Sequence, residues 1–183
     1  MDKKLINRFV LKMDELNIIA KSIIDGTSTK DVDDILEQAY VEGFLSGKYI
    51  LGGEEEIDAK DVQSALNQKY EGIDILSKAK TSIQSKDITS LVRLLESEYH
   101  RMYNQGSLDY AKKNKSQGEK IYKTWVAIID EKTRDTHLFL NGTKVPLDAY
   151  FYSYDGDKAL IPGGFSSASN NVNCRCILDY TQV

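Results

Sequence analysis

The chain has 183 residues, of which 41% are hydrophobic and 28% charged, so it is long enough to bury a core and has the composition of a soluble globular protein. No apolar stretch approaches the ~20 residues that a membrane-spanning helix needs. Charged and polar residues near the start, among them Arg8 and Lys12, leave no room for the apolar core of a signal peptide. The sequence therefore predicts no membrane association and synthesis in the cytoplasm of the producing cell.

The net charge of -4 gives no general case for nucleic-acid binding, but the charge is unevenly distributed. Basic residues clearly outnumber acidic ones from Arg101 to Lys123. Such a run is usually the solvated face of a helix, and the alternative is a surface that contacts DNA phosphates. The stretch 101–123 is therefore a candidate DNA contact and no more than that.

The first half of the chain predicts helices. Apolar residues recur at spacings of three and four from Leu5 to Ile24, which indicates an amphipathic helix that ends at Asp25-Gly26. Ser28 is the expected cap of a second helix, whose apolar side extends from Val32 to Gly43.

Two further helices are expected after a connection over residues 46–53. The third spans about Asp58 to Lys80, behind an acidic run that suits a helix N-terminus. The fourth starts at Ser85-Lys-Asp87, contains Ile88 and extends to about Lys113, with Gly106 marking a break.

After Gly118 the sequence becomes typical of strands. Residues 122–129 are rich in β-branched and aromatic side chains. Asn141-Gly142 predicts a type I′ hairpin turn, and Asp155-Gly156 is a second turn candidate. Further short apolar patches, interpreted as strands, cover residues 137–140, 143–145, 150–152, 159–161 and 174–180.

We therefore expect an α+β fold with two parts. Residues 1–117 would form a helical region of about four helices that binds a partner, and residues 118–183 would form a small β-rich domain. No internal repeat or low-complexity segment is visible.

The densest group of functional side chains lies in residues 130–137. Arg134 and His137 occur there with Asp130 and two further acidic residues. Such a group suits an active site or a metal site, but it also suits a turn in which a carboxylate accepts N–H groups while an arginine clamps it. On chemistry alone the structural interpretation is favoured.

The second half of the sequence, including residues 130–137, resembles a known family, the phage minor head proteins typified by the F protein of phage Mu. The resemblance covers roughly residues 88–180, and its upstream part includes Ser97-Glu98, Arg101 and Asn104-Gln-Gly106. The residues that carry it are, in order, Trp125, Asp130, Thr133, Arg134, His137, Gly142, Pro162, Gly163, Asn173, Cys174, Arg175 and Cys176.

The resemblance implies a low-copy head component that acts near the portal in capsid assembly or in DNA packaging and delivery. Such a protein would be found in the host cytoplasm during assembly and inside the head once incorporated. Family members commonly carry a longer N-terminal helical region, so the portal contact of this chain is an open question. Two alternatives remain: a nuclease- or transferase-like domain that uses Arg134 and His137, and a capsid-interference or host-interaction protein that reuses the minor head domain.

The two cysteines suggest a metal site. Cys174 and Cys176 would point to the same face of a strand, and a disulfide between them would close a small, strained ring. With His137, and with Asp130 or a water as fourth ligand, they would make a tetrahedral zinc site; His100 is a possible substitute. The alternative is two small buried thiols, a histidine satisfied by backbone groups, and Arg175 paired to an acid.

Overall fold

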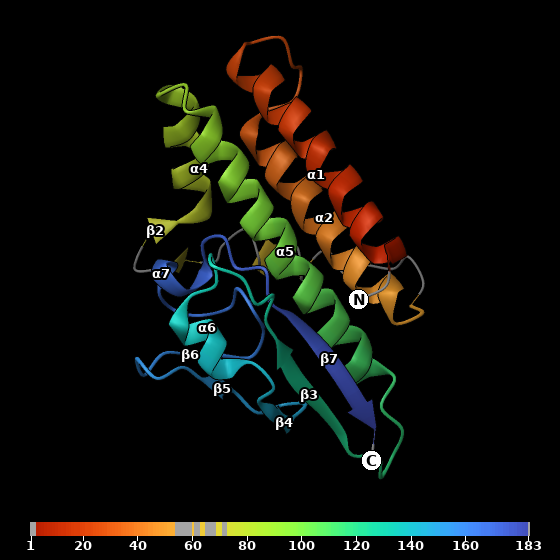
Figure 1. Ribbon diagram of the computed structural model, residues 1–183. Helices are drawn as coiled ribbons and strands as arrows, with labels where there is room; N and C mark the ends of the chain where they lie inside the picture. The colour runs from red at the N-terminus through yellow and green to blue at the C-terminus, as the bar shows by residue number, and fades with distance from the viewer. Residues whose placement is uncertain (1–2, 54–59, 61–62, 65–68, 71–72, 183) are drawn as a thin grey trace.

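The computed structural model describes residues 3–53, 60, 63–64, 69–70 and 73–182, and it confirms the α+β fold class. Three long helices lie side by side, and a shorter one lies beside the first half of the last of them (Figure 1). Their bounds are α1 (Lys3–Ile24), α2 (Val32–Ile50), α4 (Ile75–Gln84) and α5 (Ile88–Lys113). Within the described residues, none of the helices has the length and apolar character needed to cross a membrane.

The C-terminal part is built on a three-stranded antiparallel sheet in the order β4-β3-β7. Strand β3 (Ile121–Val126) lies between β4 (Lys144–Pro146) and β7 (Ile177–Gln182), with Trp125 opposite Leu178. Around the sheet lie α6 (Asp135–Leu140), the hairpin of β5 (Phe151–Tyr152) and β6 (Lys158–Ala159), and α7 (Ala168–Asn171). The predicted turn at Asp155-Gly156 is confirmed, since it joins β5 to β6.

Helices α2 and α5 approach each other closely because glycines face the contact. A Cβ added at Gly47 would lie 1.9 Å from the carbonyl oxygen of Tyr103, and one added at Gly106 would lie 2.0 Å from that of Phe44. Both helices run on through these positions, so the connection expected to begin at Ser46 and the break expected at Gly106 were wrong. The glycines serve helix packing here and do not end the helices.

The third expected helix was also wrong over part of its length. Residues 54–59, 61–62, 65–68 and 71–72 lie outside the described residues, so that part of the expectation is not addressed. Lys69–Tyr70 (β1) and Ile73–Asp74 (β2) pair as antiparallel strands, and α4 begins only at Ile75. The start is fixed by Asp74, whose carboxylate accepts the Ser77 N–H at 2.5 Å as an N-cap.

Two smaller expectations need correction in the same way. The cap of α2 is Asp31 and not Ser28, and it forms a capping box with Asp34. Residues 137–140, expected as a strand, belong to helix α6. Thr136, His137 and Leu140 are buried while Leu138 and Phe139 are exposed, a one-sided pattern that fits a helix better than alternation along a strand.

The turn at Asn141-Gly142 exists but is not of type I′. Asn141 has φ -56° and ψ 127°, Gly142 has φ 78°, and the Thr143 N–H donates to the Leu140 carbonyl at 2.9 Å. These values define a type II turn, in which only the second central residue needs positive φ. It joins α6 to β4 rather than two strands.

Helix α5 takes part in both hydrophobic clusters of the protein. Its first half contributes Leu91, Leu95, Tyr99 and Met102 to a cluster with α1, α2 and α4. Its second half contributes Leu108 and Ala111 to a cluster centred on Trp125. The division expected at residue 117 stays a prediction about which part folds independently, since this helix spans the two parts in space.

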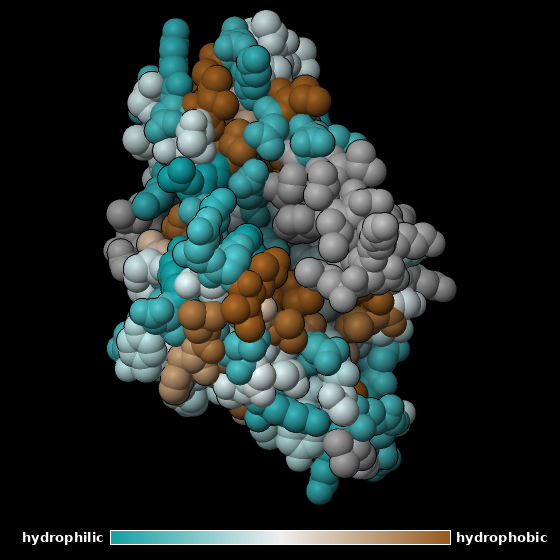
Figure 2. All heavy atoms as spheres, viewed as in Figure 1, coloured by the Kyte–Doolittle hydropathy of each residue, from teal (hydrophilic) through white to brown (hydrophobic). Residues whose placement is uncertain are grey.

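Hydrophobic side chains also gather on the surface, over α6 and the segment that follows β3 (Figure 2). Among the described residues of these segments, Ile129 is 69% exposed and Phe139 58% exposed, and Ile128 and Leu138 are partly exposed as well. Apolar surface of this kind is typical of a protein contact.

Candidate metal centre

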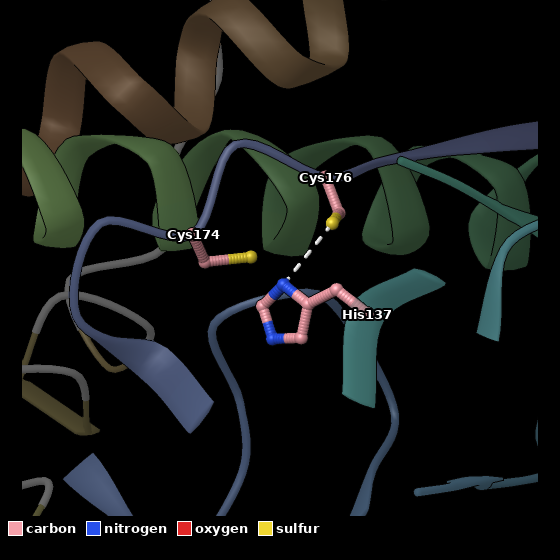
Figure 3. A group of neighbouring side chains, drawn as sticks. All are labelled: His137, Cys174 and Cys176. Atoms are coloured by element: carbon pink, nitrogen blue, oxygen red, sulfur yellow. Dashed lines mark hydrogen bonds between the residues drawn. The ribbon is translucent and has the colours of Figure 1, made fainter. Parts of the chain in front are cut away.

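His137 and the two cysteines come together as a buried group. His137 lies on α6, and Cys174 and Cys176 lie on the segment that leads into β7 (Figure 3). Their side chains point toward one another, and one donor atom from each lies within 4.8 Å of the other two. The three residues are 2%, 5% and 3% exposed, respectively.

The protein fixes the tautomer of His137. Nε2 lies 2.9 Å from the carbonyl oxygen of Asn170, which can only accept a hydrogen bond, so Nε2 carries the proton. The other nitrogen, Nδ1, faces the Sγ atom of Cys176, 3.3 Å away. A backbone carbonyl that orients the far nitrogen is the usual support of a metal-binding histidine.

The pKa values of the two thiols are shifted in opposite directions. A hydrogen bond from Cys174, followed by the proximity of His137, lowers the pKa of Cys176 to about 5. The same hydrogen bond and burial raise the pKa of Cys174 well above its ordinary value. Cys176 is therefore the more acidic of the two thiols, and a bound cation would favour the thiolate form of both.

Helix α5 holds the segment that carries Cys176. His100 Nε2 lies 2.7 Å from the Cys176 carbonyl oxygen, to which Asn104 Nδ2 also donates at 3.1 Å. Asn104 Oδ1 accepts the Leu178 N–H at 3.2 Å. His100 therefore supports the backbone of a candidate ligand and is not itself in the group. The role of Asn104 was not predicted, although its amide has the donor and acceptor that a strand end requires.

Asp130, the expected fourth ligand, is bound elsewhere. Its two carboxylate oxygens accept hydrogen bonds from Nη1 and Nη2 of Arg175, both at 2.7 Å. Thr133 Oγ1 also donates to Asp130, at 3.0 Å, and to the Ile128 carbonyl. Arg134 reaches the Val172 carbonyl. The Asp130–His137 stretch thus contacts the cysteine segment at two points, Val172 and Arg175.

The other residues that carry the family resemblance are buried in the core or occupy turns. Trp125 is fully buried and packs edge-on against His137 and Phe151, at ring-centroid distances of 5.8 and 5.2 Å. Pro162 is buried, and Gly163 has φ 82° with the Arg101 side chain where a Cβ would point. Gly142 supplies the turn already described.

Residues 170–173 shape the approach to the cysteines, and sequence reasoning missed most of them. Buried Asn171 accepts the Phe165 N–H at 2.9 Å and donates to the Phe165 carbonyl at 2.7 Å. Asn173 adopts φ 59°, which asparagine tolerates, and its N–H donates to Ser97 Oγ on α5. The only signal in the sequence was the clustering of asparagines directly before Cys174.

The donor set fits zinc. Two sulfurs and an imidazole nitrogen are the ligands that Zn²⁺ prefers. Zinc bonds of ~2.0–2.3 Å place tetrahedral ligands roughly 3.3–3.8 Å apart; the three donor atoms lie within 4.8 Å of one another, and His137 Nδ1 lies 3.3 Å from Cys176 Sγ. The group offers three ligands, which leaves one tetrahedral position for a ligand from elsewhere.

Comparison with known proteins gives two partial relatives. One is the minor head protein GP7 of Bacillus phage SPP1, 37% identical over 60 residues, which are 33% of this chain and 20% of that protein. The other is the NAD(+)–arginine ADP-ribosyltransferase EFV of Enterococcus faecalis, 45% identical over 62 residues, which are 34% of this chain and 12% of that protein. No solved structure gives a significant match.

The chain thus matches only a small fraction of each of these longer proteins. A family match covers far more of it. The family described as "Phage Mu protein F like protein" matches residues 17–179, a range that includes most of the helical part, the sheet and the His137–Cys174–Cys176 group. This chain therefore belongs to the Phage Mu protein F like family.

Proposed function

We propose that this chain is a head-morphogenesis module of the minor head protein type, present in few copies and acting near the portal in capsid assembly or in DNA packaging and delivery. The observation that carries the proposal is the family match over residues 17–179. The relative named a minor head protein supports it. The helical region would bind the portal or another capsid protein, in the host cytoplasm first and then inside the head.

We further propose that the C-terminal part is held together by zinc on His137, Cys174 and Cys176. The orientation of His137 by the Asn170 carbonyl and the closeness of the three donor atoms support this. A small β-rich unit gains stability from such an ion because the folded state alone assembles the ligands. The zinc has a structural role in this proposal.

The enzyme alternative receives less support. A nuclease or transferase that uses His137 would need its imidazole to reach substrate, yet the ring is 2% exposed and both nitrogens face protein atoms. Arg134 donates to a backbone carbonyl. The match to the ADP-ribosyltransferase covers 12% of that protein, which is too small a share to support the same activity here.

A protein partner is favoured over DNA bound along residues 101–123. Arg101 is buried and bonds to Glu98 at 2.6 Å, and Lys123 is fully buried with its ammonium on the Leu160 carbonyl. Lys112 and Lys113 are paired with Asp148 and Asp109. These side chains do not form a continuous basic surface, whereas the exposed apolar side chains around Ile129 and Phe139 suit a protein contact.

The test is to express the tagged chain together with the head genes of a phage that encodes it and to isolate heads and portals. We expect the chain to co-purify with them in few copies per particle, and purified chain to contain one zinc per molecule by elemental analysis. Failure to associate with any head component would contradict the assembly role. Binding to the capsid of an unrelated phage instead would favour the interference alternative. Absence of metal would contradict the zinc proposal alone.

A further inference from the structure

A groove of about 540 Å³ lies beside the His137–Cys174–Cys176 group. One wall is formed by α5, including His100, and the opposite wall by the loop residues Lys132 and Arg134. Cys174 and Arg175 also line it. The groove therefore joins one of the candidate ligands to solvent.

The other two candidate ligands face the same side. His137 and Cys176 line a much smaller hollow, whose walls share Lys132, Arg134 and Arg175 with the groove. A ligand that enters the groove thus approaches the group from the side where these cations lie. Helix α5 runs behind the cysteine segment (Figure 3).

The charges of the groove favour an anion. Lys132, Arg134 and Arg175 supply three positive charges, against Glu96 on the wall and Asp130, which is bound to Arg175. Each arginine uses only part of its five N–H donors on the protein contacts described above.

We propose that this groove binds a phosphate group, which supplies an oxygen as the fourth ligand of the zinc. The inference rests on the zinc proposal, since His137, Cys174 and Cys176 leave one tetrahedral position and zinc accepts oxygen ligands. A phosphate group brings negative charge to three cations that face two carboxylates, and the planar fork of an arginine suits two of its oxygens. The volume admits a phosphate with the group that carries it.

The experiment uses the full chain loaded with Co²⁺ in place of zinc and freed of excess metal. Cobalt bound to thiolates absorbs visible light, and the bands change when a ligand in its coordination shell is exchanged. We expect inorganic phosphate to shift these bands in a saturable manner. Arg134→Gln should weaken phosphate binding by roughly tenfold or more, the value of a charge-assisted hydrogen bond. Lys21→Gln, which changes an exposed cation on α1, should not alter it.

The outcomes separate the two proposals. If no cobalt is taken up, the zinc proposal fails, and the phosphate ligand fails with it. If cobalt binds and phosphate leaves the bands unchanged, only the phosphate ligand is overturned. An Arg134→Gln variant whose bands without phosphate equal those of the parent has kept its fold, so its loss of binding counts as support. A 5′-phosphorylated oligonucleotide is then compared with the same oligonucleotide without the phosphate. A response to the phosphorylated form alone identifies a nucleic-acid end as a phosphate source. The inference is supported by a response to this phosphorylated end or to free phosphate.

Discussion

Arg175 and Asp130 form a two-bond ion pair that connects the residue between the two cysteines to the loop after β3. The side chains are 41% and 36% exposed, so the pair is screened by solvent and contributes little to global stability. Its effect is local, since it fixes the backbone between two candidate ligands.

Asp130→Asn should therefore weaken metal binding by about tenfold, as substitutions behind a metal ligand do. Arg175 lowers the pKa of Asp130. A carboxyl whose pKa is lowered by folding stabilises the protein above its unfolded pKa, near 3.8, and this contribution is lost as the pH falls through the folded pKa. Competition with a zinc chelator at pH 7 checks the affinity. An equal affinity in the variant would show that the pair does not position the ligands.

The two histidines of the chain offer a matched test of the metal site. His137→Gln should remove zinc because it deletes the Nδ1 ligand. His100→Gln should keep zinc at one per molecule, because His100 contacts the Cys176 carbonyl and lies outside the group of donor atoms. Elemental analysis and thermal unfolding with and without a chelator measure both effects. Zinc retained by the His137 variant would exclude this residue as a ligand.

Gly106→Ala should destabilise the protein by about 3 kcal/mol or more, since the new methyl group would lie 2.0 Å from the Phe44 carbonyl oxygen and would push α2 away from α5. Gln105→Ala, at the adjacent and partly exposed position on the same helix, is the control and should change stability little. Urea unfolding compares the two. Similar stabilities would mean that the helices separate at no cost.

Lys123 should make stability depend on alkaline pH. Burial lowers its pKa from 10.5 to about 8, so between these two values the unfolded chain binds more protons and the free energy of unfolding rises with pH. The pKa values of Tyr103 and Tyr180 are raised by folding. These two groups affect the free energy of unfolding only above about pH 10, where they lower it as the pH increases. We expect the rise in the parent to exceed that in Lys123→Met by about 1–2 kcal/mol, after allowance for solvent screening. Parallel pH profiles in urea unfolding would contradict this.

Much of the fold could be predicted where periodicity was sustained. Helix α5 was expected to start at Ser85-Lys-Asp87 and to extend to about Lys113, and it spans Ile88–Lys113, because its apolar spacing continues through both clusters. Strand β3 was expected because aromatic and β-branched residues follow one another there. Glycine was the main source of error. Gly47 and Gly106 were interpreted as chain breaks, yet each is required by a neighbouring helix that is distant in the sequence, which local sequence cannot reveal.

The candidate metal ligands could be predicted from the sequence, but the residues that hold those ligands in place could not. Cys-x-Cys and His137 are visible because few residue types bind metal. Asn170 contributes only a backbone carbonyl to His137, which any residue could supply, so its identity gives no signal. Asp130 was expected among the ligands because carboxylates bind zinc. Arg175, which donates to both of its carboxylate oxygens, competes with a metal for them.

The participation of α5 in both hydrophobic clusters limits where the chain can be divided. A fragment that began at residue 118 would lose Leu108 and Ala111 from its interior and would leave the Cys176 carbonyl and the Leu178 N–H without Asn104. A fragment from residue 88 would keep them, but would expose the apolar side that Leu91 and Leu95 turn toward α2. We therefore expect the smallest portable piece of this protein to carry the helix with the sheet, and a larger protein that includes the sheet to provide cover for the helix.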